Sequence, residues 1–146
     1  MPISPENRAR YPVNWKTEVR PRILARANNC CERCLVPNGV TVVRTVFCGR
    51  PAYELGEAVH DANTGELLAE GFAMQANPEE GHQVRIVLTI AHTIDQDPAN
   101  CDDDNLQALC QRCHNRLDQA MRMANAAATR RGRKAAGDLF EVTPCP

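Results

Sequence analysis

Two pairs of cysteines are the side chains in this sequence best suited to hold a metal ion. The pairs are Cys31-Glu-Arg-Cys34 and Cys110-Gln-Arg-Cys113, each with a two-residue gap. That gap lets both sulfurs of a pair face one ion, and four thiolates satisfy Zn²⁺ as a closed structural site. The long separation between the pairs is a weak objection, because loop-closure entropy grows only logarithmically with length. The spacing therefore predicts a structural zinc site.

Other fates for the cysteines stay open at this level. The sequence has 8 cysteines, and the two pairs could instead be reduced core thiols or part of a disulfide framework. The chain begins with no apolar signal segment, which favours a cytoplasmic location, where thiols stay reduced. Metal binding is then favoured over disulfides. Four cysteines have no assigned role: Cys30, Cys48, Cys101 and Cys145.

Two histidines near the second cysteine pair are candidates for proton transfer and cation binding. His92 ends an apolar run, and His114 directly follows Cys113. Histidine exchanges a proton near neutral pH. On a helix, His114 and Asp118 would share a face next to the face of Cys113, so one helix could hold zinc and a second cation. The alternative for His92 is a packed histidine at a strand end. The alternatives for His114 are a fifth residue near the zinc and a hydrogen-bonding histidine at a helix start.

The order His92, Asn105, His114, beside two cysteine pairs, resembles the HNH endonuclease family over residues 27–118, apart from an insertion. The resemblance implies an α+β fold with a ββα-metal core, and metal-dependent hydrolysis of DNA phosphodiester bonds. It implies that His92 is the general base and that Asn105 pins the loop carrying it. It also implies that His114 or Asn115 binds a single divalent cation. Members of this family often accompany phages or mobile elements.

Ala91 departs from the pattern of that family. The family commonly places an aspartate directly before the base histidine, where it binds the cation, and alanine cannot coordinate a metal. Asp118 is the first candidate to replace this acid and Asp95 is the second. Imidazole is a softer ligand than carboxylate, so we expect activity with Mn²⁺ or Ni²⁺ to exceed that with Mg²⁺. Ala91 also favours an alternative function, a non-catalytic zinc module that binds nucleic acid or protein.

The chain is long enough for one domain with a modest core, and 43% of its residues are hydrophobic. We interpret residues 1–14 as an extended arm and expect Trp15 to pack this arm on the core. We interpret residues 35–83 as a β-rich insertion and residues 130–146 as a loose tail. Periodicity predicts secondary structure elsewhere. The expected elements are helices over 17–28 and 111–129, and antiparallel strands over 40–47, 57–60, 66–69 and 83–93. Residues 106–109 could form a strand or a helical turn.

The net charge is −1, but the charge is unevenly distributed. Residues 1–34 and 105–146 are basic, whereas residues 35–104 are acidic. Such ends could bind the phosphates of DNA, although solvated charged faces are the simpler interpretation. No apolar run approaches the roughly 20 residues that cross a bilayer, so no membrane partner is expected. The candidate phosphate-binding residues are Arg22, Arg26, Arg116 and Arg122.

Overall fold

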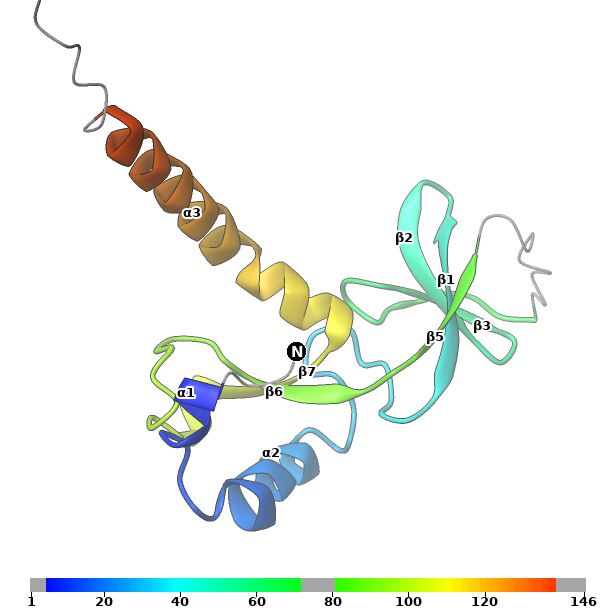
Figure 1. Cartoon of the computed structure of the whole chain (residues 1–146). Coiled ribbons are helices and arrows are strands. Elements are labelled where there is room, and N and C mark those ends of the chain that lie inside the picture. Colours follow the sequence, from blue (N-terminus) through cyan, green and yellow to red (C-terminus); the bar gives the residue numbers. More distant parts are fainter. Residues whose placement is uncertain (1–4, 72–80, 139–146) are drawn as a thin grey trace, which may run out of the picture. The chain divides into compact units, whose positions relative to one another are not determined.

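The computed structural model describes residues 5–71 and 81–138. The chain divides into two compact units, Met1–His114 and Asn115–Pro146. The first unit holds seven strands in two antiparallel sheets, together with short helices (Figure 1). The second holds most of one long helix, α3 (Gln111–Asp138). The described residues thus form the mixed α+β fold that the sequence predicts.

Within the described residues, no helix has both the length and the apolar character needed to cross a membrane.

Three short helices open the first unit: α1 (Pro5–Arg8), the π-helical turn η1 (Trp15–Val19) and α2 (Arg20–Arg26). The helix expected over 17–28 therefore begins and ends two residues earlier. It ends there because Asn28 and Asn29 have φ of 49° and 54°, a left-handed conformation that asparagine tolerates better than most residues. One turn of helix, α1, also lies in the arm that was expected to be extended.

The insertion forms a five-stranded antiparallel sheet in the order β4-β3-β2-β1-β5. Its strands are β1 (Thr41–Phe47), β2 (Arg50–Leu55), β3 (Ala58–Asp61), β4 (Leu67–Ala69) and β5 (His82–Arg85). The sequence did not predict β2, which contains Pro51. The tight turn before it uses Cys48 and Gly49 at φ of 48° and 77°, a pair of left-handed residues typical of two-residue hairpins.

The prediction of a single strand over 83–93 is wrong. The chain there forms two strands, β5 and β6 (Leu88–His92), which separate at Ile86. Ile86 is fully buried. Its N–H donates to the Val40 carbonyl, and its own carbonyl accepts the Gly39 N–H. The backbone therefore leaves the five-stranded sheet at Ile86 and enters a second sheet.

That second sheet is a hairpin of β6 and β7 (Leu106–Cys110). The pairing runs from Leu88 opposite Cys110 to His92 opposite Leu106. Residues 106–109, left open between strand and turn, therefore lie in a strand. The acidic loop between the strands ends in a 3₁₀ turn, η2 (Asp103–Asn105), and α3 begins directly after Cys110.

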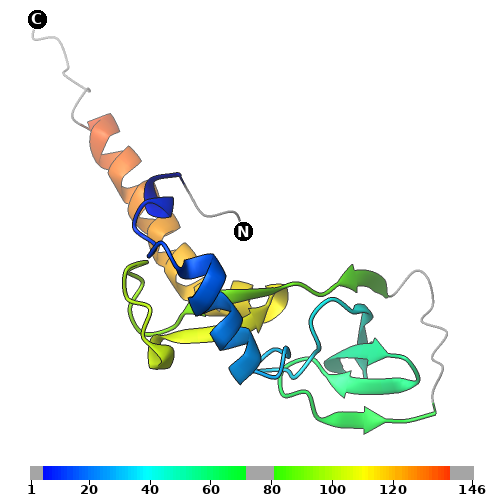
Figure 2. The ribbon, with the colours of Figure 1, turned by 90° about the horizontal axis from the view of Figure 1, so that it is seen from below.

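A small apolar core joins α2 to this hairpin. Helix α2 lies against β7 (Figure 2), and burying each large aliphatic side chain contributes roughly 1.5–3 kcal/mol. The fully buried large aliphatic side chains outside the five-stranded sheet are Ile23, Val36, Ile86, Leu88, Leu106 and Leu109. The core thus fixes the hairpin whose ends carry Cys110 and His92.

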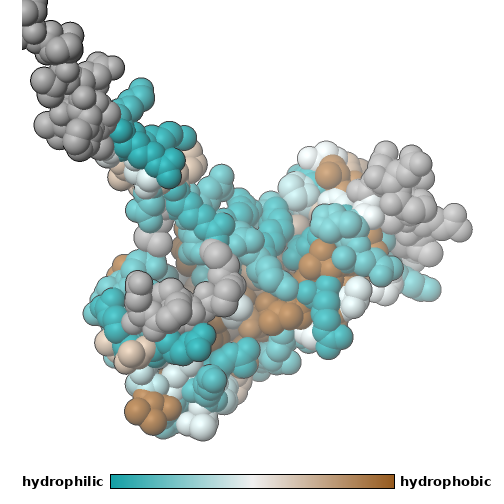
Figure 3. All heavy atoms as spheres, in the orientation of Figure 1, coloured by the Kyte–Doolittle hydropathy of each residue, from teal (hydrophilic) through white to brown (hydrophobic). Residues whose placement is uncertain are grey.

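Helix α3 continues past Thr129, where the sequence predicted its end, to Asp138. The expected loose tail over 130–146 is therefore wrong for residues 130–138. Alanine, arginine and lysine are strong helix formers, so one glycine at Gly132 costs too little to end the helix. Residues 139–146 lie outside the described part of the chain. From residue 122 to 134 almost all the described side chains are exposed, and the coloured part of the helix face shown in Figure 3 is largely hydrophilic.

Candidate metal centre and histidine site

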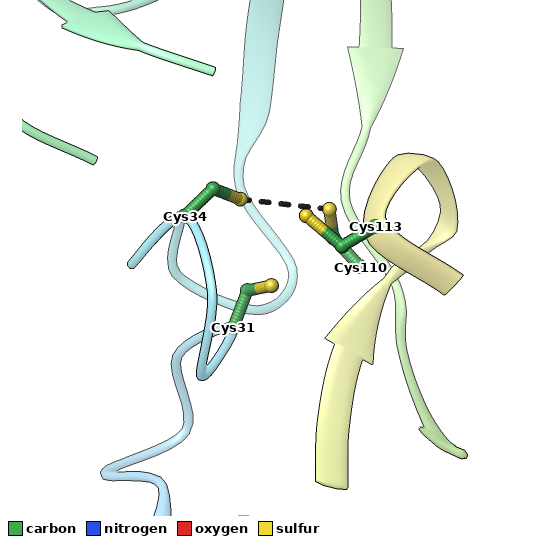
Figure 4. Close-up of side chains that lie close together, drawn as sticks. All are labelled: Cys31, Cys34, Cys110 and Cys113. Atoms are coloured by element: carbon green, nitrogen blue, oxygen red, sulfur yellow. Dashed lines mark hydrogen bonds between the residues drawn. The ribbon is translucent and has the colours of Figure 1, made fainter. Parts of the chain in front are cut away.

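The first cysteine pair lies in a tight turn that follows α2. The Cys31 N–H donates to the Val36 carbonyl, and the Leu35 N–H donates to the Cys31 carbonyl, both at 2.9 Å. Leu35 has a φ of 56°, which closes the turn sharply. Cys31 and Cys34 therefore point to the same side of the turn (Figure 4).

Glu32 joins this turn to β7. Its N–H donates to the Ala108 carbonyl at 2.9 Å, and its carboxylate accepts the Ala108 N–H at 2.6 Å. The same carboxylate accepts the Arg26 guanidinium at 2.9 Å. Since β7 ends at Cys110 and α3 begins one residue later, these bonds bring the first cysteine pair beside the second.

The four paired cysteines form one cluster. Their sulfurs all lie within 4.8 Å of one another, and all four side chains are buried. The Cys34 and Cys110 sulfurs are 3.6 Å apart, close to the roughly 3.8 Å edge of a tetrahedron with Zn–S bonds of 2.3 Å. That separation is much longer than a disulfide bond of about 2.05 Å. The cluster can therefore hold a metal ion, and Figure 4 shows the four sulfurs converging.

The cluster is electrostatically uneven. Hydrogen bonds from Cys113, Cys31 and Cys34 lower the pKa of the Cys110 thiol well below its usual range. The hydrogen bond to Cys110 raises the pKa of Cys34, since Cys34 then keeps its proton. A cation at the centre would take the place of these shared protons, because a metal binds thiolates rather than thiols.

The other described cysteines lie outside the cluster. Cys48 is exposed, whereas Cys30 and Cys101 are half-buried, and none of them is in a disulfide. Cys145 lies outside the described residues.

His92 ends β6 beneath aromatic side chains of the N-terminal segment. Its ring stacks on Trp15 with centroids 6.0 Å apart, and Tyr11 meets it edge-on at 5.8 Å. Burial is the main cause that lowers the pKa of His92 below 6.5. The carboxylates of Asp95 and Asp97 raise this pKa, and the nearby His114 lowers it further. His92 Nε2 is buried with no hydrogen-bond partner. The imidazole is therefore kept neutral to a lower pH than an exposed histidine.

Asn105 holds the loop that leaves His92. Its side-chain oxygen accepts the N–H groups of Ile94 and Asp95 at 2.9 and 2.8 Å. Its side-chain nitrogen donates to the carbonyls of Asp95 and Asn100 at 2.9 and 3.0 Å. Asn105 is only 3% exposed, so four hydrogen bonds to one buried amide fix the backbone directly after His92.

His114 lies in the first turn of α3, at the end of the first unit. Its Nδ1 is 2.6 Å from the hydroxyl of Thr89 on β6. A histidine that binds a metal through one ring nitrogen is commonly oriented by a hydrogen bond at its other ring nitrogen. Asn115 and Asp118 belong to the second unit, where the Asp118 carboxylate lies 3.8 Å from the Arg122 guanidinium.

The acids considered as substitutes at Ala91 do not complete a cation site in the first unit. Ala91 is 1% exposed and packed. Asp95 is exposed, and its carboxylate accepts the Asp97 N–H at 2.9 Å and the Asn100 side chain at 3.1 Å. The Asp97 bond is the largest cause of the lowered pKa of Asp95. Across residues 5–71 and 81–138, the cysteine cluster is the only group of three or more potential ligands within metal-binding range.

The four arginines proposed to contact phosphate differ in environment. Arg26 donates to the carbonyls of Asp103 and Leu106 and to Glu32. Arg22 forms a surface ion pair with Asp103 at 2.7 Å. Arg116 and Arg122 lie exposed on α3. The guanidinium of Arg26 thus binds groups of the first unit itself, and its expected role as a phosphate contact stays a prediction.

Sequence reasoning missed three contributors to these sites: Glu32, Thr89 and Tyr11. Glu32 stands inside the first cysteine pair, six residues from the arginine it binds, so charge pairing was a usable signal. Thr89 and Tyr11 meet their histidines only through long-range contacts, and no local spacing indicates them.

Comparisons with protein-family models, with curated proteins and with solved structures found no match to this chain.

Proposed function

We propose that this protein is a zinc-stapled nuclease of the HNH type, which hydrolyses phosphodiester bonds of DNA. Zn²⁺ is the metal we assign to Cys31, Cys34, Cys110 and Cys113, because four buried thiolates leave no open coordination position. The zinc would be structural, joining the turn after α2 to the start of α3.

One arrangement carries the catalytic part of this proposal. His92 ends β6, Asn105 binds the loop that follows it, and His114 opens the helix after β7. This order of a strand, a second strand and a helix supports the proposal, because the HNH family resemblance implies two strands and a helix that carry its histidines and asparagine.

His92 is the proposed general base, which takes a proton from the attacking water. A base must be unprotonated, and the lowered pKa of His92 keeps its imidazole neutral at physiological pH. Trp15 and Tyr11 pack on the ring, and burial of the ring is the main cause of this lowered pKa. Asn105 holds the backbone after His92, so it acts as a positioning residue.

A divalent cation would supply charge stabilisation at the phosphate. His114 fits a ligand of such a cation, because Thr89 orients its ring through Nδ1. The described acids of the first unit do not complete the site. That Asp118 supplies the missing acid stays a prediction, tested by Asp118→Ala.

Exposed basic side chains of α3 are the proposed contacts to the DNA backbone. Arg130, Arg131, Arg133 and Lys134 are all exposed. Among the described residues they have no acidic partner. Phosphate contacts release counterions, so binding should weaken steeply as salt rises. Reversing the charge of Arg131 and Lys134 should weaken binding to all DNA sequences alike, whereas salt-independent binding would contradict this assignment.

Plasmid nicking by zinc-loaded protein tests the catalytic proposal. Supercoiled DNA is incubated with Mg²⁺, Mn²⁺ or Ni²⁺, with and without chelator. We expect the cutting rate of His92→Ala to fall by about 10²–10⁴-fold, with zinc content unchanged. The control is His82→Ala, which removes an exposed histidine of β5 and should cut normally. Equal cutting by both variants would remove His92 from the mechanism.

A non-catalytic zinc module is the second candidate function. The observation that favours it is that the described residues hold no second cluster of metal ligands, with packed Ala91 where an acid is expected. This candidate predicts salt-dependent DNA binding without cutting in any of the three metals. The same nicking assay, paired with a binding assay, separates the two candidates.

A further inference from the structure

Arg44 reaches the cysteine cluster from the five-stranded sheet. It lies on β1 opposite Tyr53 of β2. Its Nη2 is 3.8 Å from the Cys110 sulfur, and its guanidinium carbon is 5.7 Å from the centre of the Tyr53 ring. Arg44 is therefore held between the face of the Tyr53 ring and the Cys110 sulfur.

The guanidinium of Arg44 has no carboxylate partner among the residues that the structure describes. Its Nη1 is buried without a hydrogen bond, and no Asp or Glu of the described residues forms an ion pair with it. Arginine stays charged at all ordinary pH values. Arg44 is half-buried, and a charge partly removed from water is costly unless it is compensated. The Cys110 sulfur, 3.8 Å from Nη2, is a group that can supply this compensation as a thiolate.

The charge of the proposed metal centre is complementary. Four thiolates around one Zn²⁺ carry a net charge of −2, and all four sulfurs are buried away from water. Such a site gains from hydrogen bonds and positive charge in its surroundings, which tune how firmly the metal is held. Arg44 supplies both to Cys110.

We propose that Arg44 is a positioning residue of the metal centre, which compensates the negative charge of the four thiolates and slows metal loss. This inference rests on the proposed zinc site. It makes the inserted sheet part of that site, and not merely an addition between its two halves.

Two further contacts keep the sheet in place around the first cysteine pair. The Tyr53 hydroxyl donates to the Cys34 carbonyl at 3.0 Å. Gly65, in the turn between β3 and β4, has a φ of 78°, and a Cβ there would lie 2.6 Å from the Cys34 oxygen. These contacts hold the five-stranded sheet against the Cys34 carbonyl. Arg44 belongs to the same sheet, so its position relative to the cysteine cluster is fixed as well.

Zinc release to a colorimetric chelator tests this proposal on the full chain. Arg44→Met removes the charge while keeping an unbranched side chain, and we expect it to lose zinc about 10–100-fold faster than the wild type. Arg44→Lys keeps the charge and should restore part of the retention. The matched control is Arg85→Met, which removes an exposed arginine of β5 in the same sheet and should release zinc at the wild-type rate.

A second readout follows the thiolates directly and does not depend on nuclease activity. In Co²⁺-loaded protein, the sulfur-to-metal charge-transfer bands should shift in Arg44→Met and not in Arg85→Met. Should Arg44→Met fail to fold, Arg44→Lys and Tyr53→Phe carry the test, with faster zinc release expected from each. Wild-type retention and unshifted bands in the Arg44 variants would overturn this inference alone. A folded wild type without bound metal would overturn the zinc proposal as well.

Discussion

The cysteine cluster and the histidine site are two candidate centres in one unit, and only the first has a complete set of ligands. The cluster joins four buried side chains of one type within 4.8 Å. The histidine site has His92 and His114, a packed alanine where an acid is expected, and Asp95 occupied within its own loop.

The difference follows from how each site is built. Each cysteine pair is a local motif, so two turns and one docking contact through Glu32 are enough to bring the four sulfurs together. The histidine site draws on a strand end, a loop and a helix start. Each part is held separately, by Trp15, Asn105 and Thr89. Local motifs thus complete a metal site here, whereas the dispersed site depends on every long-range contact.

Cys113→Ser should have the largest effect, because it removes one ligand of the complete centre. Structural zinc contributes roughly 10–16 kcal/mol of apparent binding energy in small domains, so its loss should leave the first unit unfolded. Elemental analysis and circular dichroism measure the two consequences. Cys48→Ser, at an exposed cysteine outside the cluster, is the matched control and should keep zinc and fold. A folded, metal-free Cys113→Ser protein would contradict the idea that the cysteine cluster, unlike the histidine site, is a complete metal centre on which folding depends.

Asn105→Ala should rank second, since it leaves the Ile94 and Asp95 N–H groups without their acceptor. The Asn105 side chain makes four part-buried hydrogen bonds in this loop. A typical intramolecular hydrogen bond contributes about 0.5–1.5 kcal/mol, so we expect about 3 kcal/mol of destabilisation in chemical denaturation. Amide hydrogen exchange should accelerate at Ile94 and Asp95 while the cysteine cluster keeps its zinc. Gln96→Ala removes one exposed hydrogen bond in the same loop and should change little. Unchanged exchange in Asn105→Ala would show that the loop is held by other contacts.

Arg26→Ala and Arg22→Ala separate two arginines that sequence alone treats alike. Arg26 donates to Glu32 and to two carbonyls, so its loss should cost about 1.5 kcal/mol of stability. Arg22 makes one exposed ion pair, worth about 0–1 kcal/mol. Thermal unfolding measures both. Equal destabilisation would contradict the structural role of Arg26, and a loss of DNA binding confined to Arg22→Ala would support a phosphate contact there.

Trp15→Ala should give the smallest effect, a rise in the pKa of His92 toward 6.5, because burial is the main cause of its depression. In the unfolded chain His92 binds a proton near pH 6.5, whereas in the folded protein it binds a proton only at a lower pH. Stability therefore falls as pH drops from above 6.5 toward the folded pKa. This acid-sensitive interval should narrow in Trp15→Ala. NMR titration of the imidazole measures the pKa, with Trp15→Phe, which keeps an aromatic ring, as control. No shift in Trp15→Ala would mean that other groups bury His92.

Several features were readable from the sequence alone. The equal gaps within Cys31–Cys34 and Cys110–Cys113 identified the metal cluster, because a two-residue gap is a local property of the backbone. The five residues between the expected strands over 57–60 and 66–69 read Asp-Ala-Asn-Thr-Gly, a composition typical of a turn. Asp61 closes this turn by accepting the N–H groups of Asn63 and Thr64. The start of α3 at Gln111 follows from helical periodicity.

The tertiary structure decided what local pattern could not. The continuous apolar run over 83–93 has the composition of one strand, and only the pairing of Ile86 with Gly39 and Val40 divides it between two sheets. The approach of Arg44 to Cys110 and the stacking of Trp15 on His92 join residues 66 and 77 positions apart in sequence. Such contacts arise from packing and leave no periodic signal, so they become visible only when the chain is folded.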